Sequence, residues 1–267
     1  MMPGAFNAAT ARLVERAGFP AVYVSGAGLA NATAGVPDIG LLTLTEVAQL
    51  AGYIAEAVRI PALADADTGF GGPENVARAI HTFELAGLAG VHLEDQAFPK
   101  RCGHLAGKEL VPIEEMTAKI AAAAQARRDR DFLLVARTDA RSVEGFDAAV
   151  RRAQGYLEAG ADAVFPEALE SAPEFREFAR RVRAPLLANM TEFGRSPLLS
   201  ARQLAAMGYR MVIFPQTVFR ATMKAAECCL SDLKRRGTQR SWLGRMQTRQ
   251  ELYDLMDYDP RAASWKR

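Results

Sequence analysis

Short apolar runs alternate along this chain with longer amphipathic stretches. One sequence pattern recurs along the chain. A helix ends in Ala-Gly or Met-Gly, two turn residues follow, and then come an apolar run and polar or acidic residues. Glycine allows the left-handed conformation that ends helices, and a continuous apolar run is typical of a strand buried on both faces. The pattern occurs four times, with apolar runs at residues 21–25, 90–94, 163–167 and 211–215.

Three more apolar runs, at residues 61–65, 132–137 and 185–189, lack the glycine but are followed by the same polar groups, which brings the expected strands to seven. Strict alternation of strand and helix predicts a parallel sheet, and seven or eight repeats favour a closed α/β barrel of the (β/α)8 TIM type over an open doubly wound sheet. The expected helices between the strands cover residues 43–58, 74–86, 114–128, 146–159, 172–182 and 200–207.

The first repeat departs from this pattern. A helix is expected from Ala8 to Ala17, and the residues left for a strand before it, 1–4, are too few for a full strand. We therefore expect a truncated first strand: either the start of the chain is assigned late or the barrel closes with a short strand. No linker divides the remainder, so residues 1–267 are expected to form one barrel domain, with residues 238–258 as a C-terminal helical extension.

Composition excludes several classes of protein. Of 267 residues, 49% are hydrophobic and 24% charged, which is typical of a globular chain. The 33 basic and 31 acidic residues are scattered, so no basic stripe predicts a nucleic-acid partner. We expect neither a signal peptide nor a membrane span, because the N-terminus lacks a cationic segment followed by an apolar core and no apolar run approaches about 18 residues. Three cysteines suit a reducing cytoplasm, and Cys228 and Cys229 are expected to pack in an amphipathic helix over residues 222–234.

Polar groups follow six of the seven expected strands, where the working residues of a parallel barrel lie. Asp65 and Asp67 are two residues apart, so on an extended strand they would point the same way, and Glu94 ends the next strand. Oxygen donors without thiolate or paired imidazole suit Mg2+ or Mn2+ rather than zinc, although helix caps or salt bridges remain the alternative. Arg137 and Arg220 could each clamp a carboxylate or form an internal salt bridge.

One cysteine lies in a strongly polar segment, Lys100-Arg101-Cys102-Gly103-His104. Two neighbouring cations would favour the thiolate, so the pKa of the Cys102 thiol is expected below that of a free thiol. The segment is too polar for a buried inert cysteine. His81 and His92 are expected to have structural roles, since one falls within a helix and the other within a strand.

The chain resembles the isocitrate lyase/phosphoenolpyruvate mutase superfamily over nearly its whole length, and within it the 2-methylisocitrate lyases most. The resemblance implies a Mg2+-dependent cleavage of 2-methylisocitrate to pyruvate and succinate, the lyase step of the methylcitrate cycle in propionate catabolism. It also implies a homotetramer in which neighbouring subunits exchange their last helices. The motifs that carry it are residues 23–26, 35–38, 65–71, 94–96, 100–104, 136–140, 165–168, 188–194 and 246–253.

Residue roles follow from the same resemblance. Asp65 and Asp67 match positions that hold Mg2+, with Glu94 helping through water, and Asp38 matches an active-site aspartate. Cys102, on a loop that closes as a lid, would protonate the carbanion left by the cleavage. The base that removes the hydroxyl proton stays open among Tyr23, Asp38 and a metal-linked group. The expected substrate-binding residues are Ser25, Gly26, Ala27, Cys102, Gly103, Arg137, Glu167, Asn189, Thr191, Arg220 and Arg249.

Three alternatives remain open beside this function. Carboxyphosphonoenolpyruvate mutase carries the same Lys-Arg-Cys-Gly-His loop, and only residues 191–193 together with Arg220 favour the lyase. A lyase for a related dicarboxylate such as dimethylmalate differs by a methyl group, which is worth only about 1–3 kcal/mol of discrimination. A non-catalytic barrel is the third alternative, because the first strand is short and residues 259–267 differ from the final helical segment of the superfamily.

Overall fold

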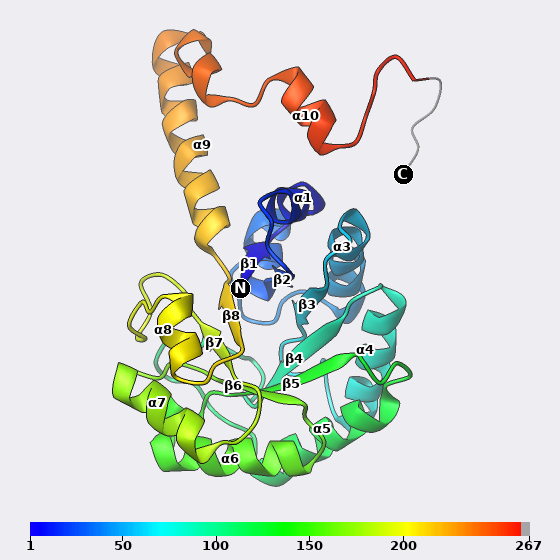
Figure 1. Cartoon of the computed structure of the whole chain (residues 1–267), viewed down its shortest axis with the longest axis vertical. Helices are drawn as coiled ribbons and strands as arrows, with labels where there is room; N and C mark the ends of the chain where they lie inside the picture. Colours follow the sequence, from blue (N-terminus) through cyan, green and yellow to red (C-terminus); the bar gives the residue numbers. More distant parts are fainter. Residues whose placement is uncertain (263–267) are drawn as a thin grey trace.

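Eight parallel strands form a barrel in the computed structural model of the chain, which describes residues 1–262 (Figure 1). Their hydrogen-bonded order is β6-β5-β4-β3-β2-β1-β8-β7, and a parallel bridge between Val164 and Leu186 joins the two ends of that order. The expected (β/α)8 barrel is therefore confirmed. The strands are β1 Met2–Ala5, β2 Val22–Val24, β3 Ala62–Asp65, β4 Gly90–Glu94, β5 Leu133–Thr138, β6 Ala163–Pro166, β7 Leu187–Asn189 and β8 Met211–Phe214.

The N-terminal segment supplies the first strand. β1 has four residues, as do β3, β6 and β8, and it pairs with β2 through Gly4 and with β8 through Met2. A Cβ atom on Gly4 would lie only 2.1 Å from the carbonyl oxygen of Pro215. The close approach of β1 to the segment after β8 thus requires a glycine at this position.

Helices surround the strands (Figure 1), and the helices between strands bury one face each. In α4, for example, Pro73 occupies the first turn, and Val76, Ile80 and Phe83 are fully buried at helical spacing. Each helix expected between strands forms with its ends within a few residues of the predicted ones. They are α1 Ala8–Arg16, α3 Leu44–Ala57, α4 Pro73–Leu85, α5 Ile113–Ala126, α6 Phe146–Glu158, α7 Ala172–Arg181 and α8 Ala201–Ala206, with a short α2 Gly26–Leu29 after β2.

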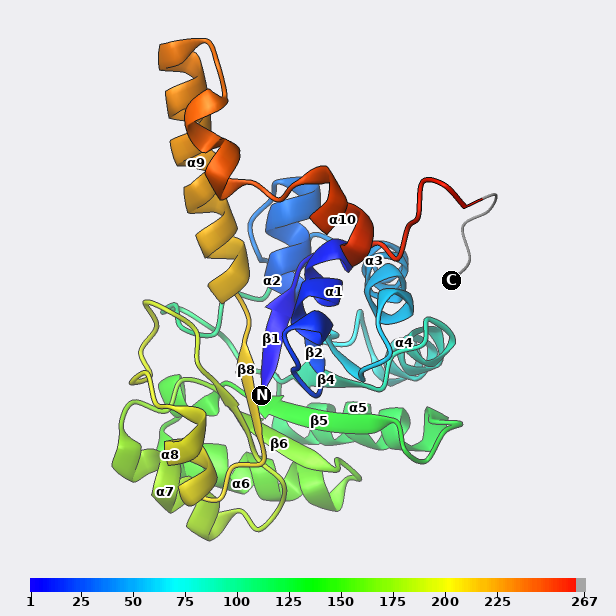
Figure 2. The same ribbon diagram turned by 45° about the horizontal axis from the view of Figure 1, so that its top comes forward.

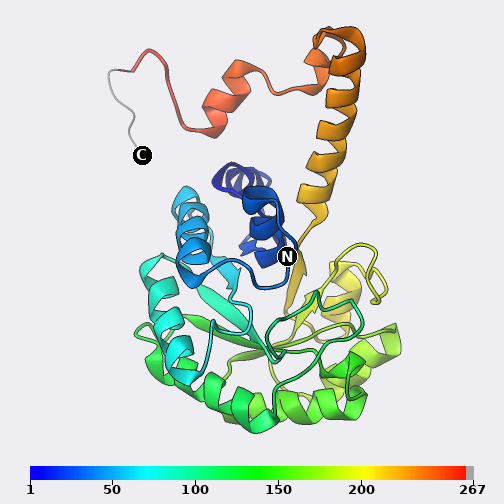
Figure 3. The same cartoon turned by 180° about the vertical axis from the view of Figure 1, so that it is seen from behind.

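The helix after β8 does not cover the barrel. α9, Thr217–Arg236, extends away from the strands and buries none of its residues (Figures 1 and 3). The expectation that Cys228 and Cys229 pack in this helix is wrong for the single chain, because Cys228 is exposed and Cys229 only half-buried. Where α9 meets the barrel, its first turns lie against β1.

The extension turns back toward the barrel through a 3-10 turn at Arg240–Arg245 and α10, Arg249–Leu255 (Figure 2). There Arg12 of α1 donates to the Leu255 carbonyl at 2.9 Å and pairs with Asp257 at 2.7 Å. Residues 263–267, part of the stretch expected to differ from the superfamily, lie outside the described residues. In residues 1–262, no helix is both long enough and apolar enough to cross a membrane.

Candidate active site

Asp65 and Asp67 lie together at the end of β3, but not because they point the same way from one extended strand. Strand β3 ends at Asp65, and Asp67 takes a left-handed backbone conformation with φ of 47°. The Asp67 N–H donates to Asp65 Oδ1 at 3.0 Å, so a tight turn brings the two carboxylates together. The predicted extended strand through both residues is thus wrong, because the chain must turn at the barrel rim to reach α4.

Asp65 also connects to two side chains inside the barrel. The Tyr23 hydroxyl donates to Asp65 Oδ2 at 3.4 Å and lies 2.8 Å from His92 Nε2. Burial and the Asp65 carboxylate raise the pKa of Tyr23 well above its usual value, and burial together with Arg137 lowers the pKa of His92 to about 3. Both groups are therefore neutral near pH 7. A neutral, hydrogen-bonded tyrosine is a poor base in the protein alone.

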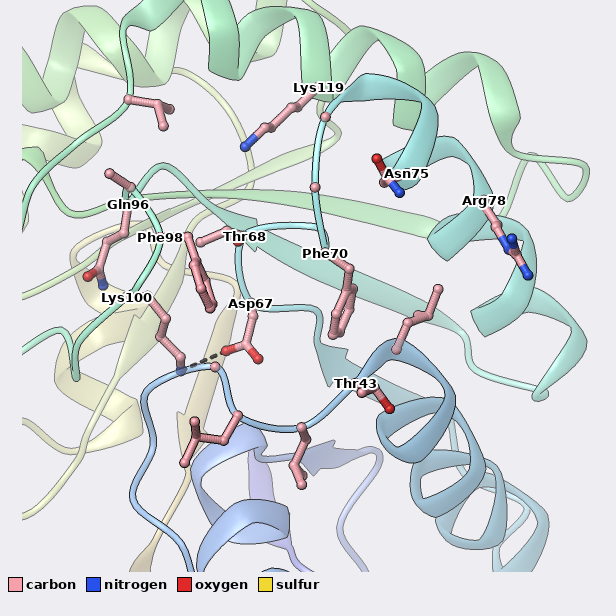
Figure 4. Close-up of a pocket in the computed structure, with 18 of the residues that line it drawn as sticks. Thr43, Asp67, Thr68, Phe70, Asn75, Arg78, Gln96, Phe98, Lys100 and Lys119 are labelled. Atoms are coloured by element: carbon pink, nitrogen blue, oxygen red, sulfur yellow. Dashed lines mark ion pairs between the residues drawn. The ribbon is translucent and has the colours of Figure 1, made fainter.

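A lysine from the loop after β4 reaches the same acids. Lys100 Nζ is hydrogen-bonded to Asp38 Oδ1 and lies 2.6 Å from Asp67 Oδ1, and the lysine side chain is only 3% exposed. Although burial opposes it, the carboxylates of Asp67 and Glu94 raise the pKa of Lys100 well above its usual value. Figure 4 shows the ion pair between Lys100 and Asp67 beside a cavity of about 770 Å³. The cavity lies between the start of α3, the loop that precedes α4, and helix α5.

Arg137 lies at the centre of a second group of charges, at the end of β5. Its guanidinium makes two hydrogen bonds to Asp139, at 2.9 and 3.2 Å, and it is 3.1 Å from Glu94 Oε2 and 3.4 Å from Glu167 Oε2. Asn189 Nδ2 donates to Glu167 Oε2 at 3.2 Å. The ends of β4, β5, β6 and β7 thus contribute to one network, as the barrel order predicts.

The acids of the site differ in how their charge is balanced. Although burial would raise it, Arg137 and His104 hold the pKa of Glu167 well below its usual value. Burial raises the pKa of Asp65, raises that of Asp67 to about 6 and raises that of Glu94 well above its usual value, despite the opposing effect of nearby cations. The positive charge near these three buried carboxyl groups is therefore too small to keep their pKa values at the usual level.

The same three acids fit a hard divalent cation. Glu94 Oε1 is buried and makes no hydrogen bond, while Glu94 Oε2 and Asp67 Oδ1 have only their ion pairs, with Arg137 and Lys100 respectively. Oxygen ligands are the donors that Mg2+ or Mn2+ prefers, and a cation among these acids would supply the positive charge that their raised pKa values show to be lacking. Within residues 1–262, however, no three acidic, histidine or cysteine side chains are already arranged to coordinate one ion together.

The environment of Cys102 differs from the one expected. The ammonium of Lys100 is directed to the acids, and burial, with the Glu167 carboxylate, raises the pKa of the Cys102 thiol even though the residue is exposed on its loop. The predicted low thiol pKa is therefore wrong. The physical reason is chiefly burial of the thiol, which disfavours the thiolate, while the lysine charge is paired with carboxylates that are distant in the sequence. A protonated thiol is suited to give up a proton rather than to attack as a nucleophile.

The loop with Cys102 presses closely onto the barrel. A Cβ atom on Gly103 would lie 2.4 Å from Arg137 Nη2 and 2.5 Å from Glu167 Cγ, so only glycine fits there. His104 Nε2 is 2.9 Å from Glu167 Oε1, while His104 Nδ1 accepts from the N–H of Arg195 at 3.0 Å. Because Nδ1 is an acceptor, the Nε2 proton of the imidazole faces the carboxylate.

Other expected substrate residues lie at or outside the rim. Ser25 caps α2, its hydroxyl accepting from the Gly28 N–H at 3.1 Å. A Cβ atom on Gly26 would lie 2.9 Å from Asp65 Oδ2, so the start of α2, which also carries Ala27, touches the acids. Thr191 is half-buried in the loop after β7.

Two expected arginines are not brought into the network. Arg220 of α9 is 3.8 Å from Glu192 and stacks over the Phe193 ring at 5.5 Å. Arg249 of α10 is exposed and makes no hydrogen bond or ion pair with any residue in the part of the chain that the structure describes.

The sequence predicted no role in the site for His92 or His104, and for Lys100 only an effect on the Cys102 thiol. For His92 a signal was available, because it precedes Glu94 by two residues on β4 and therefore faces the same side of the strand. Lys100 and His104 lie in the motif around Cys102, but nothing in their local sequence shows that their partners are Asp38 and Glu167.

Comparison with known proteins adds family information to this geometry. The phosphoenolpyruvate phosphomutase family matches residues 1–234 of the chain. The chain is 54% identical to 2-methylisocitrate lyase of Aeropyrum pernix over 268 residues, which cover 99% of this chain and 86% of that protein. It is 50% identical to 2-methylisocitrate lyase of Bacillus subtilis over 257 residues, which cover 96% of this chain and 84% of that protein.

Two solved structures are similar in both fold and sequence. A crystal structure of 2,3-dimethylmalate lyase, a member of the PEP mutase/isocitrate lyase superfamily, matches with a TM-score of 0.91 and 37% identity over 96% of this chain and 85% of that one. Phosphonopyruvate hydrolase in complex with oxalate and Mg2+ matches with a TM-score of 0.87 and 34% identity over 96% of this chain and 89% of that one.

Proposed function

The chain belongs to the phosphoenolpyruvate phosphomutase family and is a carbon–carbon lyase of the 2-methylisocitrate lyase type, and we propose that it cleaves 2-methylisocitrate to pyruvate and succinate in the methylcitrate cycle. One observation carries the proposal: buried acids without sufficient positive charge lie beside a buried arginine, under a loop that holds a protonated thiol. That combination suits a hydroxy-tricarboxylate whose cleavage leaves a carbanion.

Asp65, Asp67 and Glu94 would hold a Mg2+ ion, with Mn2+ as a substitute. When bound, the cation would hold the α-hydroxycarboxylate group of the substrate and lower the pKa of its hydroxyl group. The buried Glu94 Oε1, which makes no hydrogen bond, and the raised pKa of Asp67 support this assignment. A relative of known structure was crystallised with Mg2+ and oxalate.

The protein groups would divide the remaining chemistry between them. Arg137 and Asn189 would bind substrate carboxylates beside Glu167, and the backbone N–H groups of Gly26 and Ala27 would bind another. Asp38 is the better candidate for the base, because Tyr23 holds its proton too tightly. The Cys102 thiol would then protonate the carbanion of the departing succinate.

A parallel assay tests the substrate assignment. Purified protein with Mg2+ is offered 2-methylisocitrate, isocitrate and dimethylmalate, with pyruvate, glyoxylate and propionate as the respective products to be measured. We expect the largest kcat/KM with 2-methylisocitrate, because relatives at 54% and 50% identity carry that name. Faster cleavage of dimethylmalate would move the assignment to that substrate. If none of the three acids is cleaved, and carboxyphosphonoenolpyruvate offered in a separate reaction gives a product with a C–P bond by 31P NMR, the mutase alternative would hold.

We also propose that this barrel domain with its extension works in the cytoplasm as a homotetramer with exchanged C-terminal helices. α9 buries none of its residues, and Met223 and Leu230 are 52% and 65% exposed on it, a surface suited to a second copy of the chain. In such an assembly the exposed Arg249 could reach the site of a neighbouring subunit, where the resemblance places it against substrate.

Mixed oligomers test that arrangement. Arg249→Ala and Cys102→Ser should each be nearly inactive alone. Refolded together in equal amounts, they should regain about a quarter of wild-type activity, because random pairing leaves that share of sites with both residues intact. A mixture that stays as inactive as the two separate variants would show that Arg249 does not serve a neighbour. Mixing Arg249→Ala with itself is the control.

A further inference from the structure

The segment that carries Cys102 is a loop, residues 97–110, whose two ends meet. Gln96 and Leu110 form an antiparallel bridge, and the Ala97 N–H donates to the carbonyl of Glu109 at 2.8 Å. Because both ends of the loop are fixed at one place, its tip can move as a unit. The position of the thiol therefore depends on contacts made within the loop and between its tip and the barrel.

Three consecutive carbonyl groups around Cys102 each accept a hydrogen bond from a different donor. Only the last of these donors, the Lys108 ammonium, also binds a residue of the barrel. The three bonds are Gln96 Nε2 to the Arg101 carbonyl at 2.8 Å, the Leu105 N–H to the Cys102 carbonyl at 2.9 Å, and Lys108 Nζ to the Gly103 carbonyl.

Lys108 is almost completely enclosed. Its side chain is 1% exposed, and Nζ lies 2.7 Å from Oδ1 of Asp139, which is itself fully buried. Gly107 precedes it with φ of 76°, a left-handed conformation that turns the chain inward and that other residues adopt only with strain. Burying an ammonium group is costly unless it is paired, so this lysine is held in one position by its two partners.

The same carboxylate also holds Arg137. Asp139 accepts two hydrogen bonds from that guanidinium, at 2.9 and 3.2 Å, and Oδ1 is shared between the guanidinium and Lys108. Asp139 thereby connects the loop to the arginine that would bind substrate. A displacement of Lys108 would therefore alter the hydrogen bonds that Asp139 accepts from Arg137, and a displacement of Arg137 would alter the contact with Lys108.

We propose that Lys108 is a positioning residue of the lyase, which pins the Gly103 carbonyl to Asp139 and so fixes Cys102 above the site in register with Arg137. Its effect on the reaction rests on the proposed function. The pinning of the loop does not, and it can be measured without substrate.

Lys108→Met tests the link between the Gly103 carbonyl and Asp139, because it retains an aliphatic side chain and removes the ammonium group. An arginine-specific protease measures opening of the loop, since it cuts after the exposed Arg101 and has no site at position 108. Loss of a charge-assisted hydrogen bond should raise the rate of that cut about 10- to 100-fold. With 2-methylisocitrate, kcat should fall by a similar factor, while Mn2+ affinity measured by electron paramagnetic resonance should stay unchanged.

Three further variants distinguish loss of the Lys108 contact from a general loss of stability. Lys119→Met removes another buried lysine, one that pairs with Glu115 at 3.2 Å outside the loop, and should leave the rate of cutting after Arg101 unchanged. Lys108→Gln keeps a donor for the Gly103 carbonyl without the charge and should give an intermediate rate. Asp139→Asn also alters the two hydrogen bonds from Arg137. Adding it to Lys108→Met should nevertheless speed cutting no further than the faster of the two single variants, since both changes break the Lys108–Asp139 contact.

Cutting of Lys108→Met at the wild-type rate would overturn the proposal, as would an equal acceleration in Lys119→Met. If cutting accelerates but no hydroxy acid is cleaved by the wild-type protein, the pin stands and the proposed function fails. If the wild-type protein cleaves 2-methylisocitrate and Lys108→Met does so at the same kcat, the function stands and the positioning role fails.

Discussion

Asp65→Ala is expected to abolish the metal dependence of the lyase and to lower kcat/KM by about 10³-fold or more, since a bound metal contributes several kcal/mol to stabilising the transition state. Asp65 is the acid at which β3 ends, and it touches Asp67, Tyr23 and Gly26. Its loss removes a proposed metal ligand and the acceptor of the Asp67 N–H, which shapes the turn. Mn2+ binding measured by isothermal titration calorimetry should be lost together with activity.

Asp65→Asn separates charge from shape. The asparagine Oδ1 can still accept from the Asp67 N–H and from the Tyr23 hydroxyl, but it carries no charge. Because burial raises the pKa of Asp65, the ionised form is unfavourable in the metal-free protein. The free energy of unfolding at pH 8 without metal should therefore be unchanged or higher in Asp65→Asn. Added Mg2+ should raise the Tm of the wild-type protein but not that of the variant.

Asp131→Ala is a matched control, because this exposed aspartate precedes β5 at the opposite end of the barrel. It should keep both wild-type activity and Mn2+ affinity. An Asp65→Asn protein with wild-type Mn2+ affinity would contradict the assignment of Asp65 as a metal ligand.

Cys102→Ser is expected to lower kcat by about 10²- to 10⁴-fold and to leave Mn2+ affinity unchanged. A serine hydroxyl is a much weaker acid than a thiol, so it transfers a proton to the carbanion poorly, and general acid catalysis is worth a factor of this size. Steady-state kinetics with 2-methylisocitrate and direct Mn2+ titration measure the two effects. Cys228→Ser, in the exposed part of α9, is the control and should retain activity.

The pH profile gives a second test of the same role. A proton donor works only while it is protonated, and a raised pKa keeps the Cys102 thiol protonated to higher pH. The kcat of the wild-type protein should therefore stay level through the ordinary thiol pKa of about 8.5 and decline only above it. If kcat instead rises with pH across this range, the thiolate is the active form and the donor role is wrong.

Much of the fold could be predicted because each element has a periodic pattern of its own. Apolar runs such as residues 90–94 gave the strands, and glycines such as Gly87 and Gly160, both at positive φ, marked the helix ends. Helix α9 was the exception in packing. Its amphipathic pattern predicted a buried face, yet the helix leaves the barrel, because a sequence pattern indicates that a face is apolar without indicating which chain covers it.

The candidate site was predictable only as far as barrel geometry carries strand ends to one rim. Asp65, Glu94, Arg137 and Glu167 were found in that way. The partners of Lys100 and Lys108 were not, because Asp38 and Asp139 lie 62 and 31 residues away along the chain.

The sequence by itself determined the barrel, the order of its elements and the residue types at its rim, because burial periodicity and chain order are local properties. Only the tertiary structure decided which charges pair, that Asp67 turns to meet Asp65, and that the Cys102 thiol has a raised rather than a lowered pKa. The physical reason is that pairing and desolvation depend on distances between segments that are remote in the sequence. A cation beside a cysteine in the chain therefore need not act on its thiol in the fold.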